Sequence, residues 1–488
     1  MNTFFYPLQK LNGFERAKEC LDTGKTCQVT GCADSQLAHF ITGLSDGYKN
    51  KVIVTFSGTK AKELYEDLKA FDKNVVLYPA KDFIFFSADV HGNVILQQRL
   101  ECIKKLVEDK PCTIVTTADG LMDKIMPLDR IKENVLEISE GSIIEMDAIR
   151  HKLVQMGYEG AEQVESPGQF AIRGSIIDIY TLTDEVPYRI DMWDDEVDII
   201  KSFEVETQRS IENLEKITIY PATDYVLTKE EIRAGIDKIK KDLKKNSEAL
   251  RKQFKTEEAH RLEVIIKEFI DNEEINENGM SFDSYVNYFY DGMVSFIDYL
   301  KDAAFFIDEP KRVDEQMKAV ETEFRDSMSN RLEKGYVLPG QTDIVWSRKT
   351  IESKLDSVKK VLFTSLDQTV KNFTVDEIAS VEAKTISPYN NKFEMLVEDL
   401  KKYKKQKYQV IMVCASLTRA KRLAEDLRGF GISAFYEEDK EREALSGEVM
   451  IVTGHLRGGF AYPMIKFVVI SDTDIFGEKK KKRRKLKK

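Results

Sequence analysis

The residues of this sequence that could bind phosphate lie in a glycine-containing loop, residues 30–36, which directly follows a short apolar run. In nucleotide-binding α/β proteins such a loop ends in Gly-Lys-Ser or Gly-Lys-Thr, and its amides and lysine hold the phosphates. Here Gly31 and Ser35 are present, but the loop has no lysine, and the carboxylate of Asp34 would repel a phosphate. Residues 24–26 do spell Gly-Lys-Thr, but they precede the run, so a turn is the better interpretation. The sequence predicts a degenerate nucleotide loop.

A second candidate for nucleotide chemistry is the apolar run 305–307, which ends in Asp308 and Glu309. This is the form of a Walker B segment, whose acid would hold Mg²⁺. Without an upstream lysine for phosphate the set is incomplete, and an acidic strand end followed by a turn is the alternative. Arg457, in a glycine-rich loop, could meet phosphate or pair with a carboxylate. An ATP-hydrolysing, helicase-like enzyme that uses Asp308, Glu309 and Arg457 is therefore a competing hypothesis.

A third group of candidates lies in short β-type runs between residues 162 and 221. In the run 188–193 the alternation of a strand places Arg189, Asp191 and Trp193 on one face and three apolar residues on the other. Such a face is either solvated, with an Arg–Asp pair, or protein-binding, because arginine and tryptophan most often anchor interfaces. Arg173, in the neighbouring run 170–173, is expected to join it.

Metal and thiol chemistry find little support. The six cysteines have no CxxC spacing and the five histidines are dispersed, so we predict buried free thiols and no metal site. We identify no catalytic residue.

Composition describes a soluble globular protein of several domains, with 42% hydrophobic and 32% charged residues over 488 positions. No apolar run approaches the roughly 18 residues of a membrane span, and the N-terminus lacks the pattern of a signal peptide, so we expect a cytoplasmic protein without a membrane partner.

The net charge of −10 conceals a basic tail, residues 479–488, with nine basic side chains. The remaining chain holds 65 basic and 84 acidic residues, a net charge of −19, and is a poor general binder of nucleic acid. The tail is either a solvated linker or an arm that contacts DNA weakly.

The elements that must position these residues indicate an α/β multidomain protein. Strands alternate with helices in residues 1–121 and again in 346–475, which predicts parallel sheets of the doubly wound kind. Residues 122–221 are β-rich, 222–345 begin with a densely charged helical region and end with the run before Asp308, and 476–488 form the basic linker or tail.

The segments SPGQFAIRGSIIDIY (166–180), DEVPYRIDMWDDEVD (184–198) and ETQRS (206–210) resemble the transcription-repair coupling factors, in the part homologous to the excision-repair protein UvrB. The resemblance covers essentially the whole chain and is most specific in these segments. It implies a RecA-like, P-loop NTPase-like domain split into 1–121 and 222–345, an inserted domain 122–221 that binds the repair sensor UvrA, and a further α/β domain in 346–475.

In the family the UvrA contacts fall on an arginine of an Arg-Gly pair, an arginine after Pro-Tyr and an aromatic four residues later. Here these are Arg173, Arg189 and Trp193. The aromatic is commonly phenylalanine, so tryptophan keeps an apolar contact of a different size.

The resemblance further implies an adaptor that recruits UvrA and nucleotide excision repair to lesions where RNA polymerase has stalled. Full-length members displace the polymerase with ATP and Mg²⁺, and their C-terminal domains contact RNA polymerase and double-stranded DNA. We expect this chain to be a fragment without those domains, without a cofactor or ATPase activity of its own, and with its UvrA-binding face unmasked. The alternative is an ATP-dependent helicase-like or UvrB-like damage-verification protein.

Overall fold

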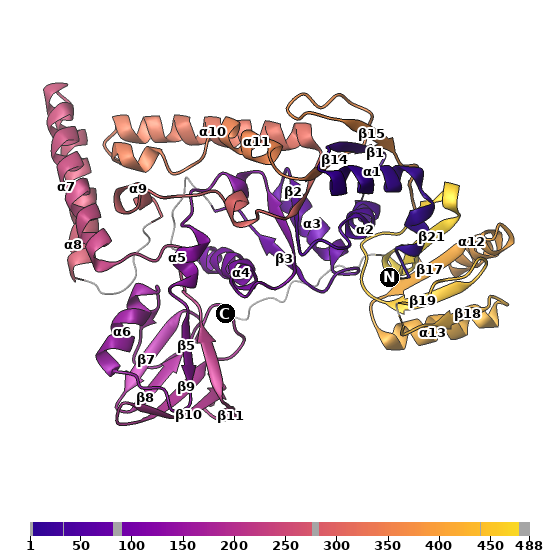
Figure 1. Ribbon diagram of the computed structural model, residues 1–488, viewed down its shortest axis with the longest axis horizontal. Coiled ribbons are helices and arrows are strands. Elements are labelled where there is room, and N and C mark those ends of the chain that lie inside the picture. The colour runs from indigo at the N-terminus through magenta and orange to yellow at the C-terminus, as the bar shows by residue number, and fades with distance from the viewer. Residues whose placement is uncertain (1–2, 33, 82–89, 276–282, 440, 478–488) are drawn as a thin grey trace.

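The computed structural model describes residues 3–32, 34–81, 90–275, 283–439 and 441–477 (Figure 1). Figure 1 shows a central sheet wrapped by helices, with a β-rich module on one side of it, a second α/β unit at one end and a helical pair at the other. Within the described residues, none of the helices combines the length and apolarity that a membrane crossing requires.

The central sheet has seven strands in the order β15-β1-β14-β13-β2-β4-β3, and all its pairings are parallel. Its inner strands are apolar runs buried on both faces, as parallel sheets require. The sheet confirms the predicted α/β class and is consistent with a RecA-like domain. The strands are β1 (Cys27–Thr30), β2 (Asn50–Thr55), β3 (Val75–Tyr78), β4 (Cys112–Thr117), β13 (Ala304–Asp308), β14 (Lys360–Thr364) and β15 (Glu377–Ser380).

Helices cover both faces of this sheet. α1, α2 and α3 supply side chains to the apolar core on one face, and α4, α10 and α11 supply them to the core on the other. The helices are α1 (Asn12–Thr23), α2 (Asp34–Leu44), α3 (Gly58–Leu68), α4 (Val90–Val107), α10 (Pro310–Glu333) and α11 (Arg348–Asp356).

One predicted boundary needs correction. We expected the last domain to begin at residue 346, but β14 pairs with β1 and β13, and β15 pairs with β1, so both strands belong to the central sheet. Strand–helix alternation shows that a parallel sheet forms, but it does not show which of two such sheets a strand joins. The second sheet begins only at Lys384.

The β-rich module contains a six-stranded sheet in the order β11-β10-β9-β8-β7-β6 and the pair β5–β12. α6 packs on one face of the large sheet, and side chains from α4 join the same core. The elements are β5 (Leu136–Ser139), α6 (Met146–Gln155), β6 (Glu159–Gly160), β7 (Gln169–Arg173), β8 (Ile176–Ile179), β9 (Tyr188–Trp193), β10 (Glu196–Phe203), β11 (Ser210–Leu214) and β12 (Lys216–Ile219).

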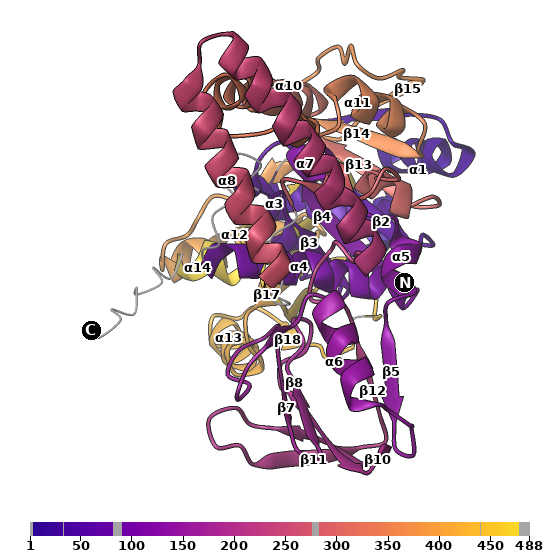
Figure 2. The ribbon, with the colours of Figure 1, turned by 90° about the vertical axis from the view of Figure 1, so that its left-hand side faces the viewer.

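The charged region after this module is helical, as predicted. Thr228 and Glu231 form a capping box that starts α7 (Lys229–Lys252). α8 (Thr256–Ile275) returns beside it, and Figures 1 and 2 show the two as a hairpin at one end of the molecule. Two short helices, α5 (Leu128–Lys132) and α9 (Val286–Phe289), lie at its base.

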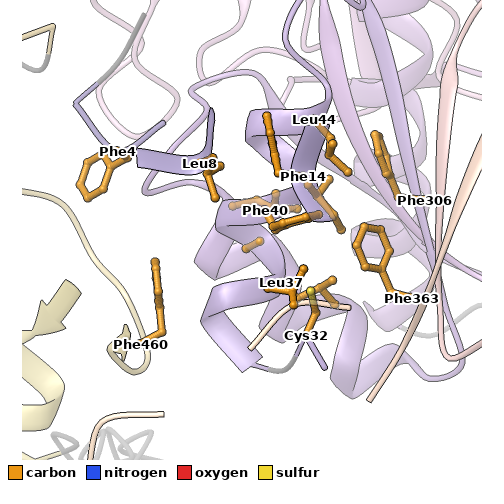
Figure 3. Close-up of a cluster of buried hydrophobic side chains, with 14 of the residues drawn as sticks. Phe4, Leu8, Phe14, Cys32, Leu37, Phe40, Leu44, Phe306, Phe363 and Phe460 are labelled. Atoms are coloured by element: carbon orange, nitrogen blue, oxygen red, sulfur yellow. The ribbon is translucent and has the colours of Figure 1, made fainter. Parts of the chain in front are cut away.

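The last sheet has the order β16-β20-β21-β17-β19-β18. β20 pairs antiparallel with both β16 and β21, and the other pairings are parallel. Side chains of this sheet belong to the same apolar cluster as those of the central sheet: Phe460 of β20 lies in one cluster with Phe4, Phe40 of α2 and Phe363 of β14, which Figure 3 labels. The two units are therefore joined by a shared core. The elements are β16 (Lys384–Thr385), α12 (Phe393–Lys405), β17 (Gln409–Cys414), α13 (Leu417–Gly429), β18 (Ala434–Tyr436), β19 (Val449–Thr453), β20 (Phe460–Tyr462), β21 (Phe467–Ser471) and α14 (Asp472–Phe476).

Candidate protein-binding face and nucleotide loop

The outer face of the six-stranded sheet carries the predicted polar residues. In the antiparallel register Ile177 lies opposite Ile190, in the core, while Asp178 lies opposite Arg189. Residues opposite each other on paired strands share a face. Arg173, which lies opposite Ile176, therefore joins Arg189 on the side away from the core. The predicted alternation of 188–193 is confirmed.

Asp178 holds the two arginines together. Its side chain is 1% exposed, and it accepts hydrogen bonds from Nε and Nη2 of Arg189 at 2.7 and 2.9 Å and from Nη2 of Arg173 at 2.6 Å. Sequence reasoning missed this residue, although an aspartate inside the apolar run of β8 was the available signal. Asp191, which the alternation placed beside Arg189, instead pairs with Lys201 at 2.6 Å. Arg189 pairs with Asp178 because Asp178 lies directly opposite it on the adjacent strand, while Lys201 reaches Asp191 from the diagonal position on β10.

Arg189 is fixed on further sides. Its guanidinium lies 4.4 Å from the ring centroid of Phe203, and Nη2 donates to Oε1 of Gln208 at 2.9 Å. The hydrogen bond to Asp178 raises the pKa of Arg189, so the charge is secure. With 16% of its side chain exposed, Arg189 presents a rigid cation at the surface, whereas Arg173 is 43% exposed.

Trp193 ends β9 on the same face and is 77% exposed. It lies four residues from Arg189, about 13 Å along an extended strand. Ile211, in the edge strand β11, is 57% exposed as well, but it lies at the other end of β10 from Trp193. Trp193 is therefore the exposed large apolar side chain beside the two arginines, and tryptophan often anchors interfaces. We call Arg173, Arg189 and Trp193 the arginine–tryptophan face.

The degenerate nucleotide loop is covered by the chain itself. Gly31 has φ +87°, and a Cβ there would lie 2.3 Å from the carbonyl oxygen of Val381. Asp34 begins α2, and its side chain is outside what the structure describes. Ser35 is buried, and its hydroxyl accepts the N–H of Gly458 at 3.3 Å. Residues far away in sequence thus lie against the loop.

The two residues predicted as a vestigial Walker B segment, Asp308 and Glu309, have partners within the fold. Asp308 ends β13 and accepts the hydroxyl of Thr55 at 2.8 Å, and burial raises its pKa. Glu309 has φ +52° and accepts the N–H of Ser365 at 2.7 Å and the amide of Gln368 at 3.2 Å.

Arg457 contacts carboxylates of α3: Nη2 lies 2.8 Å from Asp67, which is buried, and Nη1 lies 3.2 Å from Glu63. This is the pairing that its sequence left open.

Among the residues that the structure describes, thiols and metal ligands form no further site. All six cysteines are free and buried, as predicted. Within the described ranges no cluster of three or more His, Cys, Asp or Glu side chains could hold a metal ion. The basic tail 479–488 lies outside the described residues.

Comparison with known proteins supports the resemblance. Residues 136–225, which contain the arginine–tryptophan face, match the family described as the UvrB interaction domain. The chain is 29% identical over 465 residues to the transcription-repair-coupling factor of Bacillus subtilis. The matched residues make up 94% of this chain and 39% of that protein. It is 27% identical over 462 residues to the same factor of Staphylococcus epidermidis, with the same coverage.

The chain therefore spans about two fifths of the length of these curated relatives. A solved structure described as an XPD helicase is 11% identical, with a TM-score of 0.24 over 92% of this chain and 81% of that one, which is too weak a likeness to carry an argument. The predicted resemblance to the transcription-repair coupling factors is thereby confirmed over 94% of the chain.

Proposed function

We propose that this chain is the UvrA-recruiting part of a transcription-repair coupling factor, and that it brings nucleotide excision repair to DNA where RNA polymerase has stalled. The observation that carries the proposal is the exposed arginine–tryptophan face inside the segment that matches the UvrB interaction domain. UvrA is the partner that the family resemblance assigns to this face.

The geometry supports a separate proposed role for each residue of the face. Arg189 is a preorganised cation, because Asp178 and Phe203 fix its guanidinium before any partner arrives. A fixed guanidinium binds a carboxylate with little loss of side-chain entropy. Arg173 still has donors available to solvent, and Trp193 supplies a large apolar anchor. The complementary surface would therefore present acidic groups beside an apolar pocket.

The same proposal makes the central sheet a scaffold without ATPase activity. Two features support this. The loop after β1 has no lysine, and Ser35 is engaged by Gly458. Glu309 binds a backbone amide and Gln368. ATP, Mg²⁺, RNA polymerase and double-stranded DNA would then be handled by other parts of a longer protein, as the family resemblance implies.

Binding of purified UvrA, measured by surface plasmon resonance, tests the face. Arg173→Ala is the cleanest change, because it leaves the Asp178–Arg189 pair in place. A hot-spot residue contributes about 2 kcal/mol or more, so we expect affinity to fall about 30-fold. Arg173→Ala combined with Arg189→Ala should weaken binding further.

Two controls sharpen that result. Arg150→Ala removes an exposed arginine from α6, which packs on the opposite face of the sheet, and should leave affinity unchanged. Trp193→Phe restores the aromatic common in the family and should bind like the parent, whereas Trp193→Ala should not. Parental affinity of the Arg173→Ala, Arg189→Ala protein would refute the assignment.

Isothermal titration with Mg²⁺-ATP tests the scaffold. We expect no binding to this chain. ATP binding that is lost in Asp308→Asn would instead favour the hypothesis of an ATP-dependent enzyme. That result would not decide whether the face binds UvrA, which the surface plasmon resonance measurement tests separately.

A further inference from the structure

The hairpin of α7 and α8 carries a row of exposed lysines along α7. α7 buries Ile236, Ile239 and Leu243 on one face. Lys238, Lys241, Lys245 and Lys252 follow at spacings of three, four and seven, which places them together on the opposite face, and all are exposed. We call these four residues the lysine stripe.

The charge of this segment is opposite to that of the protein. Residues 237–255 hold eight basic and three acidic side chains, a net charge of +5, in a chain whose net charge is −10. Of the stripe, Lys238 lies 3.5 Å from Asp291, while Lys241, Lys245 and Lys252 form no ion pair with any residue that the structure describes. Like charges four residues apart on a helix destabilise it. The stripe therefore lowers the stability of the hairpin. A negatively charged partner that bound it would relieve this repulsion.

The tip of the hairpin adds an aromatic residue. Phe254 is 93% exposed and has φ +61°. The N–H of Lys255 donates to the carbonyl of Leu250 at 3.0 Å, which closes α7 with Phe254 at a position where glycine is usual. A bulky residue is strained in this conformation and here gains no burial. Its ring projects into solvent two residues after Lys252.

We propose that the α7–α8 hairpin binds nucleic acid, with the lysine stripe on the phosphate backbone and Phe254 stacked on an unpaired base. Lysine is depleted in protein–protein interfaces, but its mobile point charge suits phosphates, whose neutralisation releases counterions. Exposed aromatic rings stack on bases of any sequence. The stripe and the ring together therefore fit nucleic acid better than an acidic protein.

This binding is separate from UvrA recruitment. Figure 2 shows the loop that joins α7 to α8 and the sheet of the arginine–tryptophan face at opposite ends of the molecule. Both partners could therefore be bound at once, and neither proposal depends on the other.

The test is fluorescence anisotropy of the full chain with a fluorescein-labelled 20-base-pair duplex between 50 and 200 mM salt. Lys241→Gln with Lys245→Gln removes two stripe charges and keeps good helix formers. The matched control is Lys401→Gln with Lys405→Gln on α12, where both lysines are exposed, four residues apart and without an ion pair among the described residues. The basic tail is present in every protein compared.

Each lost phosphate contact should reduce the magnitude of the slope of log K against log salt by about 0.9. The slope of the stripe variant should therefore be smaller by about 2, and the slope of the control should equal that of the parent. A parental slope in the stripe variant, or an equal loss in the control, would overturn the proposal. Poly-L-glutamate serves as a model of an acidic protein. If the stripe variant lost as much affinity for poly-L-glutamate as for DNA, the proposal would also be overturned.

Phe254→Ser tests the stacking. With a single-stranded 20-mer we expect affinity to fall about 5-fold or more, and with the duplex we expect little change. An equal effect on the two probes, or no effect on either, would refute the role of the ring.

Discussion

Asp178 is the residue on which the arrangement of the arginine–tryptophan face most depends, and Asp178→Asn tests that dependence. Asparagine keeps the size of the side chain but removes the negative charge of the carboxylate, which accepts three hydrogen bonds from the guanidinium groups of Arg173 and Arg189. Breaking a buried ion pair costs about 3–5 kcal/mol, and a hydrogen bond to a charged group is worth about 1.5–3 kcal/mol. Arg173 is 43% exposed and can return to water, but Arg189, at 16%, cannot do so fully. We therefore expect a loss of about 2–4 kcal/mol.

Hydrogen exchange measured by mass spectrometry is the suitable assay, because a chain of several domains does not unfold in two states. Peptides that cover β7, β8 and β9 should exchange about 30 to 700 times faster, since each 1.4 kcal/mol of opening free energy is tenfold in rate. Peptides from β17 serve as an internal reference.

The matched control is Asp191→Asn on the same face. Asp191 pairs with Lys201, and about a quarter of each side chain is exposed, so its loss should cost at most about 1 kcal/mol. Exchange in Asp178→Asn within fivefold of the parent, or equal acceleration in Asp191→Asn, would refute the view that the buried carboxylate organises the face.

Three further predictions concern the central sheet and its junctions. Burial lowers the pKa of His39 to about 4, so its neutral form stabilises the fold above the unfolded pKa of about 6.5, and that contribution is lost as pH falls from about 6.5 to 4. Hydrogen exchange of peptides from α2 should therefore show a difference in opening free energy between the parent and His39→Gln that shrinks by up to about 1.4 kcal/mol per pH unit as the pH falls through this range, and a constant difference would contradict it. Arg99 is fully buried between two carboxylates, so Arg99→Met should lower the opening free energy of α4 peptides in hydrogen exchange by about 3–5 kcal/mol, whereas Lys104→Met, which breaks a partly exposed pair on the same helix, should lower it by about 1 kcal/mol or less. Gly31→Ala adds a Cβ that would meet a carbonyl oxygen at 2.3 Å, and it should destabilise by about 1–3 kcal/mol more than Gly24→Ala, which has a similar φ and open space; equal losses would show that backbone conformation alone matters.

Much of the local structure could be predicted because it depends on neighbours in sequence. The apolar runs before Gly31 and Asp308 are strands. The capped, periodic stretch after Thr228 is helical. In β9 the period of two puts Arg189 and Trp193 on the outer face, since successive side chains of a strand point to opposite sides. The segments quoted from residues 166–210 carried the family resemblance as well, because they are contiguous.

Only the tertiary structure showed which segments meet. It pairs β14 and β15 with β1, although about 330 to 350 residues separate them, and no local pattern specifies that partner. It sets Val381 and Gly458 against the loop after β1, and it places Asp178 between Arg173 and Arg189. The sequence by itself determined which residues could form a binding face. The register of the strands buries one carboxylate, Asp178, where it binds both arginines, and this decided that they lie together.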